Sequence, residues 1–197
     1  MSTHDGEPGG VPDAEFCSYE AFGRSFFLHA VTIDRIKAGV SGLTGKPVEF
    51  GPIGAGPAKI AKVTANGKIG DPSVSRTSED EPLRFLLSIP VDLRFTVSLP
   101  ATDHRFRADV RIDLKLTARA AEPLRVVIDI EPPDKRDITV ALKAEGITST
   151  VLRLVSGMES EIKRFLVRYI GVEIAKPHIR EARDVDLVPY VDSTEHR

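Results

Sequence analysis

The sequence predicts an α+β fold in which a long, highly curved antiparallel meander sheet wraps around an N-terminal and a C-terminal amphipathic helix. Three observations lead to this prediction. Apolar and polar residues alternate along several long segments, short turns separate those segments, and apolar residues recur every three or four positions near both ends of the chain. Alternation with period two is typical of strands that bury one face, whereas the wider spacing is typical of amphipathic helices.

Length and charge limit the classes of protein that the chain can belong to. It has 197 residues and one cysteine, and its 27 basic and 29 acidic residues give a formal charge of −2. We expect a single domain at residues 15–192, between a disordered tail (1–14) and a frayed C-terminus (193–197). The near-neutral charge argues against a general electrostatic attraction to nucleic acid or to an anionic membrane, although it leaves a local charged patch open. Because the sequence shows neither a long apolar run nor a secretory signal pattern, we expect no stable membrane insertion and a cytoplasmic location.

The N-terminal segment from Phe16 to Leu43 predicts a helix. Its apolar residues follow three- and four-residue spacing and would share one helix face. These residues are Phe16, Tyr19, Phe22, Phe26, Ala30, Ile33, Ile36, Val40 and Leu43. A β-branched cluster at 31–33 and two internal glycines, Gly23 and Gly39, indicate that the helix starts late, bends or ends early.

The next segment predicts a loop and then a hairpin. Glycine and proline punctuate the chain from Gly42 to Pro57, which favours a loop. Asn66 and Gly67 then lie between two short β-compatible runs, and this dipeptide is typical of tight hairpin turns. We expect residues 77–82, three of which are acidic, to form a solvated link into the long strand that follows.

The segment from Leu83 to Leu99 predicts an unusually long strand. Every odd position is apolar, and the even positions are nearly all polar or proline. At roughly 3.3 Å per residue it would span about 55 Å, whereas ordinary strands have about five or six residues. Such a strand must curve to stay on a compact core. Pro90 lacks a backbone N–H, so we expect an edge position, a bulge or a bend there.

Three more alternating segments follow after short turns. They cover residues 106–118, 124–130 and 138–144, and their apolar residues would face the same side as those of the long strand. Parallel neighbours would need crossover connections of about a dozen residues or more, so the short turns predict an antiparallel meander of four strands.

The C-terminal segment predicts a second amphipathic helix. It begins near Ile147, and its apolar stripe follows a nearly ideal helical spacing. The stripe contains Ile147, Val151, Leu154, Met158, Ile162, Phe165 and Tyr169. Lys176 and Pro177 should end the helix, because the residue before proline disfavours the helical conformation. Val185 and Leu187 then indicate a short edge strand.

No motif for catalysis, metal binding or a cofactor is present in the sequence. The glycine-rich run 51–57 matches neither the dinucleotide fingerprint nor the P-loop. The histidines are scattered without the short spacings of a zinc site. We therefore expect no metal, no cofactor and no catalytic residue, with His29 as the one ionisable side chain placed beside the aromatic stripe.

The order and rhythm of these elements resemble the tubular lipid-binding superfamily, which includes the BPI-like and SMP domains. The resemblance covers about residues 16–190 and rests on the N-terminal helix, the strands LRFLLSIPVDLRFTVSL, FRADVRIDLKLTARA, LRVVIDIEPP and DITVALKAEG, and the helix VLRLVSGMESEIKRFLVRYIGVEIAKP. It implies a highly curved sheet that wraps a long helix and holds a lipid or another hydrophobic ligand between them.

Three hypotheses for function follow. The first is binding of a lipid or another elongated hydrophobic molecule in an apolar trough between the helices and the sheet. The residues expected to contact that ligand are Phe22, Phe26, His29, Leu87, Val91, Phe95, Phe165 and Tyr169. The second is self-association as a homodimer, or binding of a partner, through the same apolar surface. The third is an enzyme that acts on an apolar small molecule, with His29 or one of the inward-facing polar groups as acid or base.

Overall fold

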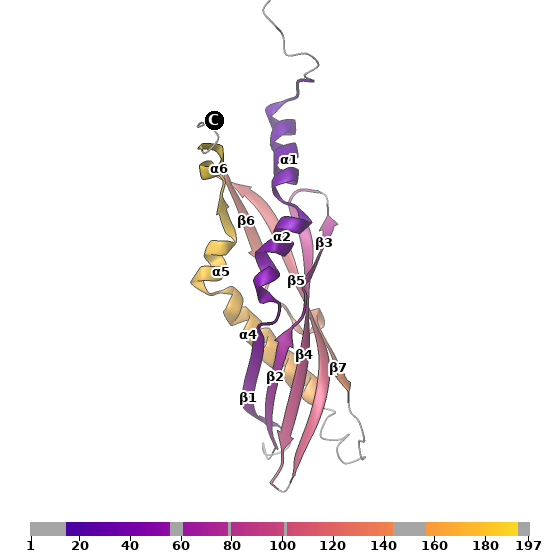
Figure 1. Ribbon diagram of the computed structural model, residues 1–197. Coiled ribbons are helices and arrows are strands. Elements are labelled where there is room, and N and C mark those ends of the chain that lie inside the picture. Colours follow the sequence, from indigo (N-terminus) through magenta and orange to yellow (C-terminus); the bar gives the residue numbers. More distant parts are fainter. Residues whose placement is uncertain (1–14, 56–60, 79, 101, 144–156, 193–197) are drawn as a thin grey trace, which may run out of the picture. The chain divides into compact units, whose positions relative to one another are not determined.

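The computed structural model describes residues 15–55, 61–78, 80–100, 102–143 and 157–192 (Figure 1). The chain divides into two compact units, Met1–Thr32 and Ile33–Arg197, and each unit is described by itself. The predicted tails at 1–14 and 193–197 lie outside the described residues.

The first unit contains helix α1 (Tyr19–Ala30). Ser18 caps the helix, because its side-chain oxygen accepts a hydrogen bond of 3.1 Å from the backbone N–H of Ala21. The helix ends where Val31 leaves the helical region, with φ −112° and ψ 86°. The next helix, α2 (Ile33–Val40), begins two residues later in the second unit. The long N-terminal helix that the sequence predicts is therefore two helices, and the break falls at the β-branched cluster.

The second unit is built around one pair of long strands. β4 (Leu83–Ser98) and β5 (Asp103–Ala121) are antiparallel and pair continuously from Leu83 opposite Ala118 to Ser98 opposite Asp103. Shorter strands extend this pair into an eight-stranded sheet of order β1-β2-β4-β5-β6-β8, with β3 on β4 and β7 on β5. These strands are β1 (Pro47–Ala55), β2 (Ala61–Ile69), β3 (Ser73–Ser78), β6 (Arg125–Ile130), β7 (Ile138–Lys143) and β8 (Asp184–Asp186).

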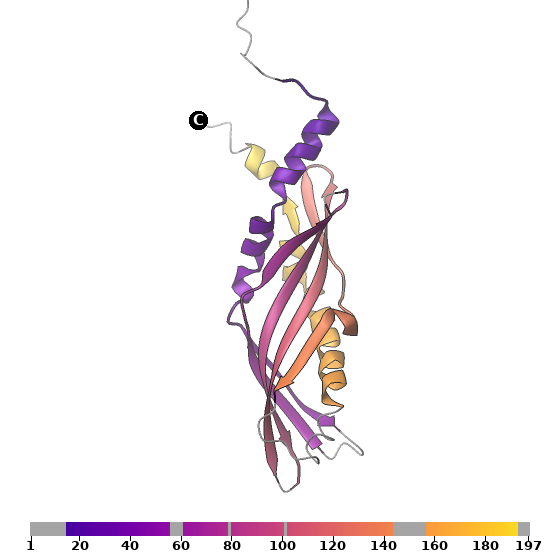
Figure 2. The same cartoon turned by 90° about the vertical axis from the view of Figure 1, so that its right-hand side faces the viewer.

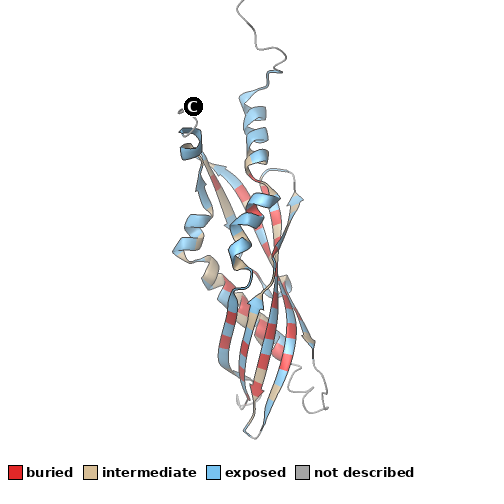
Figure 3. Ribbon diagram, viewed as in Figure 1, coloured by how far each residue is buried: buried red, intermediate tan, exposed pale blue. Residues whose placement is uncertain are grey.

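The sheet is strongly curved, as Figure 2 shows, and this confirms the predicted fold class. The apolar residues of β4 and β5 alternate with exposed or half-buried ones and form the buried face of the sheet (Figure 3). Leu93, Ala108 and Ala118 are fully buried there. Twist accumulates along strands of this length, which accounts for the curvature.

Pro90 lies at a local edge of β4, as predicted. β2 pairs with β4 as far as Val91, and β3 pairs with β4 from Ser88, so the edge is unpaired between them. The carbonyl of Pro90 accepts a hydrogen bond of 2.8 Å from the N–H of Gly70 in the β2–β3 connection. Because the N and the carbonyl of one strand residue face the same side, the missing N–H of Pro90 falls in this gap.

Helix α4 (Met158–Ile174) packs on the sheet through one stripe of buried residues. The stripe is Met158, Ile162, Leu166 and Ile170, which are four positions apart and lie on one helix face. The helix ends before Pro177, as the sequence predicts, and Pro177 is the first residue of α5 (Pro177–Ala182). The part of the predicted helix from Ile147 to 156 lies outside the described residues.

The C-terminal tail returns to the sheet. β8 pairs with β6 at the sheet edge, with Val185 opposite Val126, which confirms the predicted edge strand. Arg125 of β6 and Asp184 of β8 form a bidentate ion pair with N–O distances of 2.8 and 2.6 Å. A short helix, α6 (Val188–Asp192), follows.

The short helix η3 (Lys135–Asp137) connects β6 to β7. Asp134 caps it, because its carboxylate accepts a hydrogen bond from the backbone N–H of Arg136, and this bond lowers the pKa of Asp134 below its ordinary value. The carboxylate of Asp137 accepts a hydrogen bond of 2.8 Å from the backbone N–H of Asp134 in return. After this turn β7 pairs with β5 instead of β6, so the predicted four-stranded meander is wrong at its last strand.

Two further local predictions are wrong. Most of the predicted loop at 42–57 is strand β1, and Asn66 and Gly67 lie inside strand β2 instead of in a hairpin turn. A Cβ atom on Gly67 would lie 2.1 Å from the carbonyl oxygen of Asp92 and 2.6 Å from Leu93 Cδ2. Gly67 therefore allows β2 to approach β4 closely, a role that glycine can have within a strand as well as in a turn.

We predict that Gly67→Ala destabilises the protein by about 1–3 kcal/mol, because backbone atoms of β4 would have to shift. Gly39→Ala is the control: Gly39 lies in α2 with open space around it, and alanine there should stabilise by about 0.5–1 kcal/mol. Urea unfolding followed by circular dichroism measures both changes. Equal stability of the wild type and the Gly67 variant would contradict the packing described for β2.

Candidate functional site

Four aromatic side chains form a row between the sheet and α4. Phe95 of β4 contacts Phe50 of β1 with ring centroids 5.8 Å apart, and Phe50 stacks on Phe165 of α4 at 4.4 Å. Phe165 stacks on Tyr169 at 5.9 Å. The row runs from the core to the surface, because Phe95 is 1% exposed and Tyr169 is 39% exposed.

A hollow of about 20 Å³ lies beside this row, between α4 and strands β1 and β2. It is lined by Phe50, Ile53, Gly54, Val63, Met158, Glu161 and Ile162. A volume of this size holds about one water molecule. The lining is apolar apart from Glu161, whose carboxylate accepts a hydrogen bond of 2.6 Å from Arg164 one turn further along α4.

An irregularity in β1 allows two of its residues to line the hollow. Phe50 and Ile53 are three positions apart, so a regular strand would direct them to opposite faces. The pairing register shifts between them: Phe50 lies opposite Ala65, and Ile53 lies opposite Val63. Gly51 makes this possible with φ +105°, where a Cβ atom would lie 2.5 Å from the carbonyl oxygen of Val63.

The interior around the hollow is apolar. Among the residues that the structure describes, those that are buried include no polar or charged side chain. The described residues as a whole contain no group of three or more potential metal ligands. No helix among them is both long and apolar enough to cross a membrane. What the site offers a ligand is therefore aliphatic and aromatic surface.

Three of the predicted site residues come together in the row: Phe95, Phe165 and Tyr169. Leu87 and Val91 are buried on the same face of β4, but they are not part of the lining of the hollow.

The other three predicted residues, Phe22, Phe26 and His29, lie on α1 in the first unit. There Phe22 stacks on Phe26 with centroids 6.5 Å apart, and Nδ1 of His29 lies 2.8 Å from the backbone carbonyl oxygen of Ser25.

Sequence reasoning missed the residues that form most of the hollow. Phe50, Ile53, Val63, Met158 and Ile162 were not among the predicted ligand contacts, although Met158 and Ile162 were in the predicted helical stripe. Phe50 and Ile53 lie in the glycine- and proline-rich segment that the sequence predicts to be a loop. The bulge between them breaks the period-two alternation that would indicate a strand. Val48 and Phe50 are two positions apart and both buried, and this spacing was the sequence signal that could have indicated a strand there.

A scan against protein-family models and a search of curated proteins find no match to this chain. We therefore infer function from the residues around the hollow.

We predict that Phe50→Ala lowers the free energy of unfolding by about 3–5 kcal/mol, because Phe50 is 8% exposed and its ring contacts two others. Tyr169→Ala, at the exposed end of the row, should lower the free energy of unfolding by about 1 kcal/mol. Urea unfolding curves give both values. Equal losses in the two variants would contradict the burial gradient along the row.

Proposed function

We propose that this protein binds an elongated hydrophobic molecule, such as a lipid acyl chain, between α4 and the concave face of the sheet. This is the activity expected from the resemblance to the tubular lipid-binding superfamily. The observation that carries the proposal is the apolar hollow beside an aromatic row that reaches the surface at Tyr169. Ligand sites in proteins are typically concave and mostly apolar, with few polar groups.

Binding requires the hollow to widen, because its volume of about 20 Å³ is too small for a chain of methylene groups. The contacts between α4 and the sheet favour such a movement. Within the described ranges, the ion pairs of α4 join residues of the helix to one another or to the residues just after it: Glu159 to Lys163, Glu161 to Arg164 and Glu173 to Lys176. These pairs move with the helix. Apolar contacts, which are non-directional, hold α4 to the sheet.

A ligand can replace the contacts that widening breaks. Separation of Phe50 from Phe165 gives up one stacked pair, worth about 0.5–1.5 kcal/mol beyond its buried area. An apolar chain inserted between the two rings restores contact on both sides, and each buried methylene contributes about 0.8 kcal/mol. The exchange therefore favours a ligand with several methylene groups over a small apolar molecule.

The lining favours binding over acid–base catalysis. Its one carboxylate, Glu161, is paired with Arg164, and its other members are apolar or glycine. The histidine considered as an acid or base, His29, lies on α1 with Nδ1 directed at a carbonyl oxygen of its own helix.

A second observation favours self-association as an alternative function. Large apolar residues are exposed where β6, β8 and α6 meet: Leu124, Val185, Tyr190 and Val191. These segments are joined by the β6–β8 pairing and by a hydrogen bond of 2.9 Å from the N–H of Leu187 to the carbonyl of Leu124. Exposed apolar residues gathered in this way are typical of an interface.

We predict that Ile53→Trp weakens ligand binding by about ten-fold or more, because the larger ring fills the hollow. Met158→Ala should strengthen binding, because it enlarges the same hollow. Displacement of a fluorescent fatty acid measures affinity, and native mass spectrometry measures ligand retained from expression. Val172→Trp is the control, since Val172 is 65% exposed on α4 and outside the lining. If the wild type neither binds the probe nor retains ligand, the proposed function is wrong.

We predict that the double variant Tyr190→Ser/Val191→Ser shifts the protein from dimer to monomer, because these residues are 70% and 53% exposed in the single chain. Sedimentation velocity gives the oligomeric state. Val172→Ser is the matched control on another element, and it should leave the dimer intact. A wild type that is monomeric at high concentration would remove the self-association alternative.

A further inference from the structure

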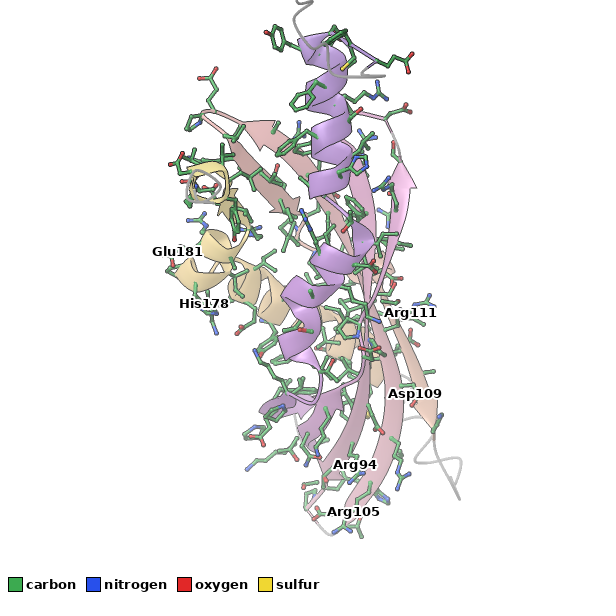
Figure 4. The ribbon with its side chains drawn as sticks, turned by 45° about the horizontal axis from the view of Figure 1, so that its top comes forward. Arg94, Arg105, Asp109, Arg111, His178 and Glu181 are labelled. Carbon is green, nitrogen blue, oxygen red and sulfur yellow. The ribbon has the colours of Figure 1, made fainter. Side chains whose placement is uncertain are left out.

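Four basic side chains gather on the convex face of the sheet, near the turn that joins β4 to β5. They are Lys62 of β2, Arg94 of β4, and Arg105 and Arg107 of β5, and we call them the basic patch. All four are exposed. Arg94 lies directly opposite Arg107, and Arg105 lies opposite Thr96 in the adjacent row of the ladder. Figure 4 shows Arg94 and Arg105 at one end of the sheet, far from His178 and Glu181 on α5.

The basic patch has acidic neighbours on the same face, with Asp92 and Asp109 in one adjacent row and Asp103 at the turn, but it forms no ion pair with them. Three other basic side chains on that face pair with acids, Arg111 with Asp113 at 3.4 Å, Lys115 with Asp137 at 3.3 Å, and Arg119 with Asp129 at 3.3 Å. Among the described residues, Lys68 and Arg84 on the same face form no ion pair. Within the part of the chain that the structure describes, none of the four patch residues forms an ion pair.

The opposition of Arg94 and Arg107 is unfavourable for folding. Like charges directly across a strand pair repel each other, whereas opposite charges there would stabilise the sheet. Asn66, the neighbour of Arg94 on β2, is uncharged, and Lys143, the neighbour of Arg107 on β7, adds a further positive charge. Asp92 and Asp109 in the adjacent row offset part of the repulsion. An anion placed over this face would offset the remainder. The arrangement is therefore better suited to an anionic partner than to the stability of the free protein.

We propose that the basic patch docks this protein onto a bilayer surface that contains anionic lipid, through charge attraction and without insertion. The patch is short along the strands, because Asp92 and Asp109 lie opposite each other in the row above it. A compact cluster suits a plane of lipid phosphates, whereas a nucleic acid is bound along an extended basic strip. No aromatic side chain accompanies the patch on the exposed positions of β2, β4 and β5, although stacking on such rings supports binding of single strands.

The position of the patch connects docking to ligand exchange. Lys62 and Val63 are adjacent in β2 and point to opposite faces, so the patch lies behind the end of the sheet whose concave face bears the hollow. Docking through the patch would bring the hollow close to a source of lipid. This role in exchange rests on the proposed function, whereas docking itself rests on the charges.

The test is flotation of the full-length protein with vesicles of equimolar phosphatidylglycerol and phosphatidylcholine. The wild type should bind these vesicles at low salt, lose binding at high salt, and not bind vesicles of phosphatidylcholine alone. Arg94→Gln/Arg107→Gln should reduce binding by about ten-fold or more. This variant removes a repulsive pair, so it should fold at least as stably as the wild type, which urea unfolding checks. Arg111→Gln/Arg119→Gln changes the net charge equally on the same face and should bind as the wild type does.

Three results would overturn the proposal: no binding of the wild type to anionic vesicles at low salt, equal loss in both double variants, or tighter binding to duplex DNA that depends on Arg94 and Arg107. Native mass spectrometry of the same samples separates the two proposals. Retained ligand without vesicle binding would overturn docking alone, and vesicle binding without ligand would overturn the proposed function alone.

Discussion

The continuous pairing of β4 with β5 is the constraint on which the second unit depends. Both strands are several times longer than the five or six residues that are usual, and they pair from Leu83 opposite Ala118 to Ser98 opposite Asp103. Strands of this length curve as their twist accumulates, and the curvature produces a concave apolar face for α4 to cover. Each of the two strands also offers an outer edge long enough for two shorter strands in succession, β2 and β3 on β4, and β6 and β7 on β5.

The candidate site depends on an irregularity in strand β1 of this sheet. The bulge at Gly51 places both Phe50 and Ile53 on the face that α4 covers, whereas in a regular strand residues three positions apart face opposite sides. The same irregularity interrupts the exposed edge of β1, which makes unwanted pairing with another chain less favourable. One local feature thus shapes the hollow and protects the edge of the sheet.

Sequence reasoning worked where a pattern repeats and failed where one glycine or turn decides the outcome. The alternation around Phe95 predicted the long strands, and the helical stripe through Ile162 predicted α4. Both patterns extend over many residues, because burial of one face requires apolar side chains at regular intervals, so one exceptional residue does not remove the signal. Gly51 and Gly67 were read as loop and turn signals, yet each serves close approach of two backbones within the sheet. The pairing of β7 with β5 depends on the capped turn at Asp134, which periodicity does not reveal. The lining residues on β1, which are Phe50, Ile53 and Gly54, were missed because Gly51 was interpreted as part of a loop.

The gap at Pro90 divides the sheet into two regions that different short strands flank, so each region can open locally by itself. On one side of it β2 pairs with β4, and on the other side β3 pairs with β4 and β6 pairs with β5. β7 pairs with β5 mostly on the β2 side and reaches past Pro90 to Ile112, and only the two long strands run the length of both regions. Local opening in proteins follows contiguous cooperative units, so amide hydrogens of β3 and β6 can exchange with solvent without disruption of β2 and β7. The hollow lies in the region of β1, β2 and α4, so local opening at the opposite end of the sheet would leave its lining in place.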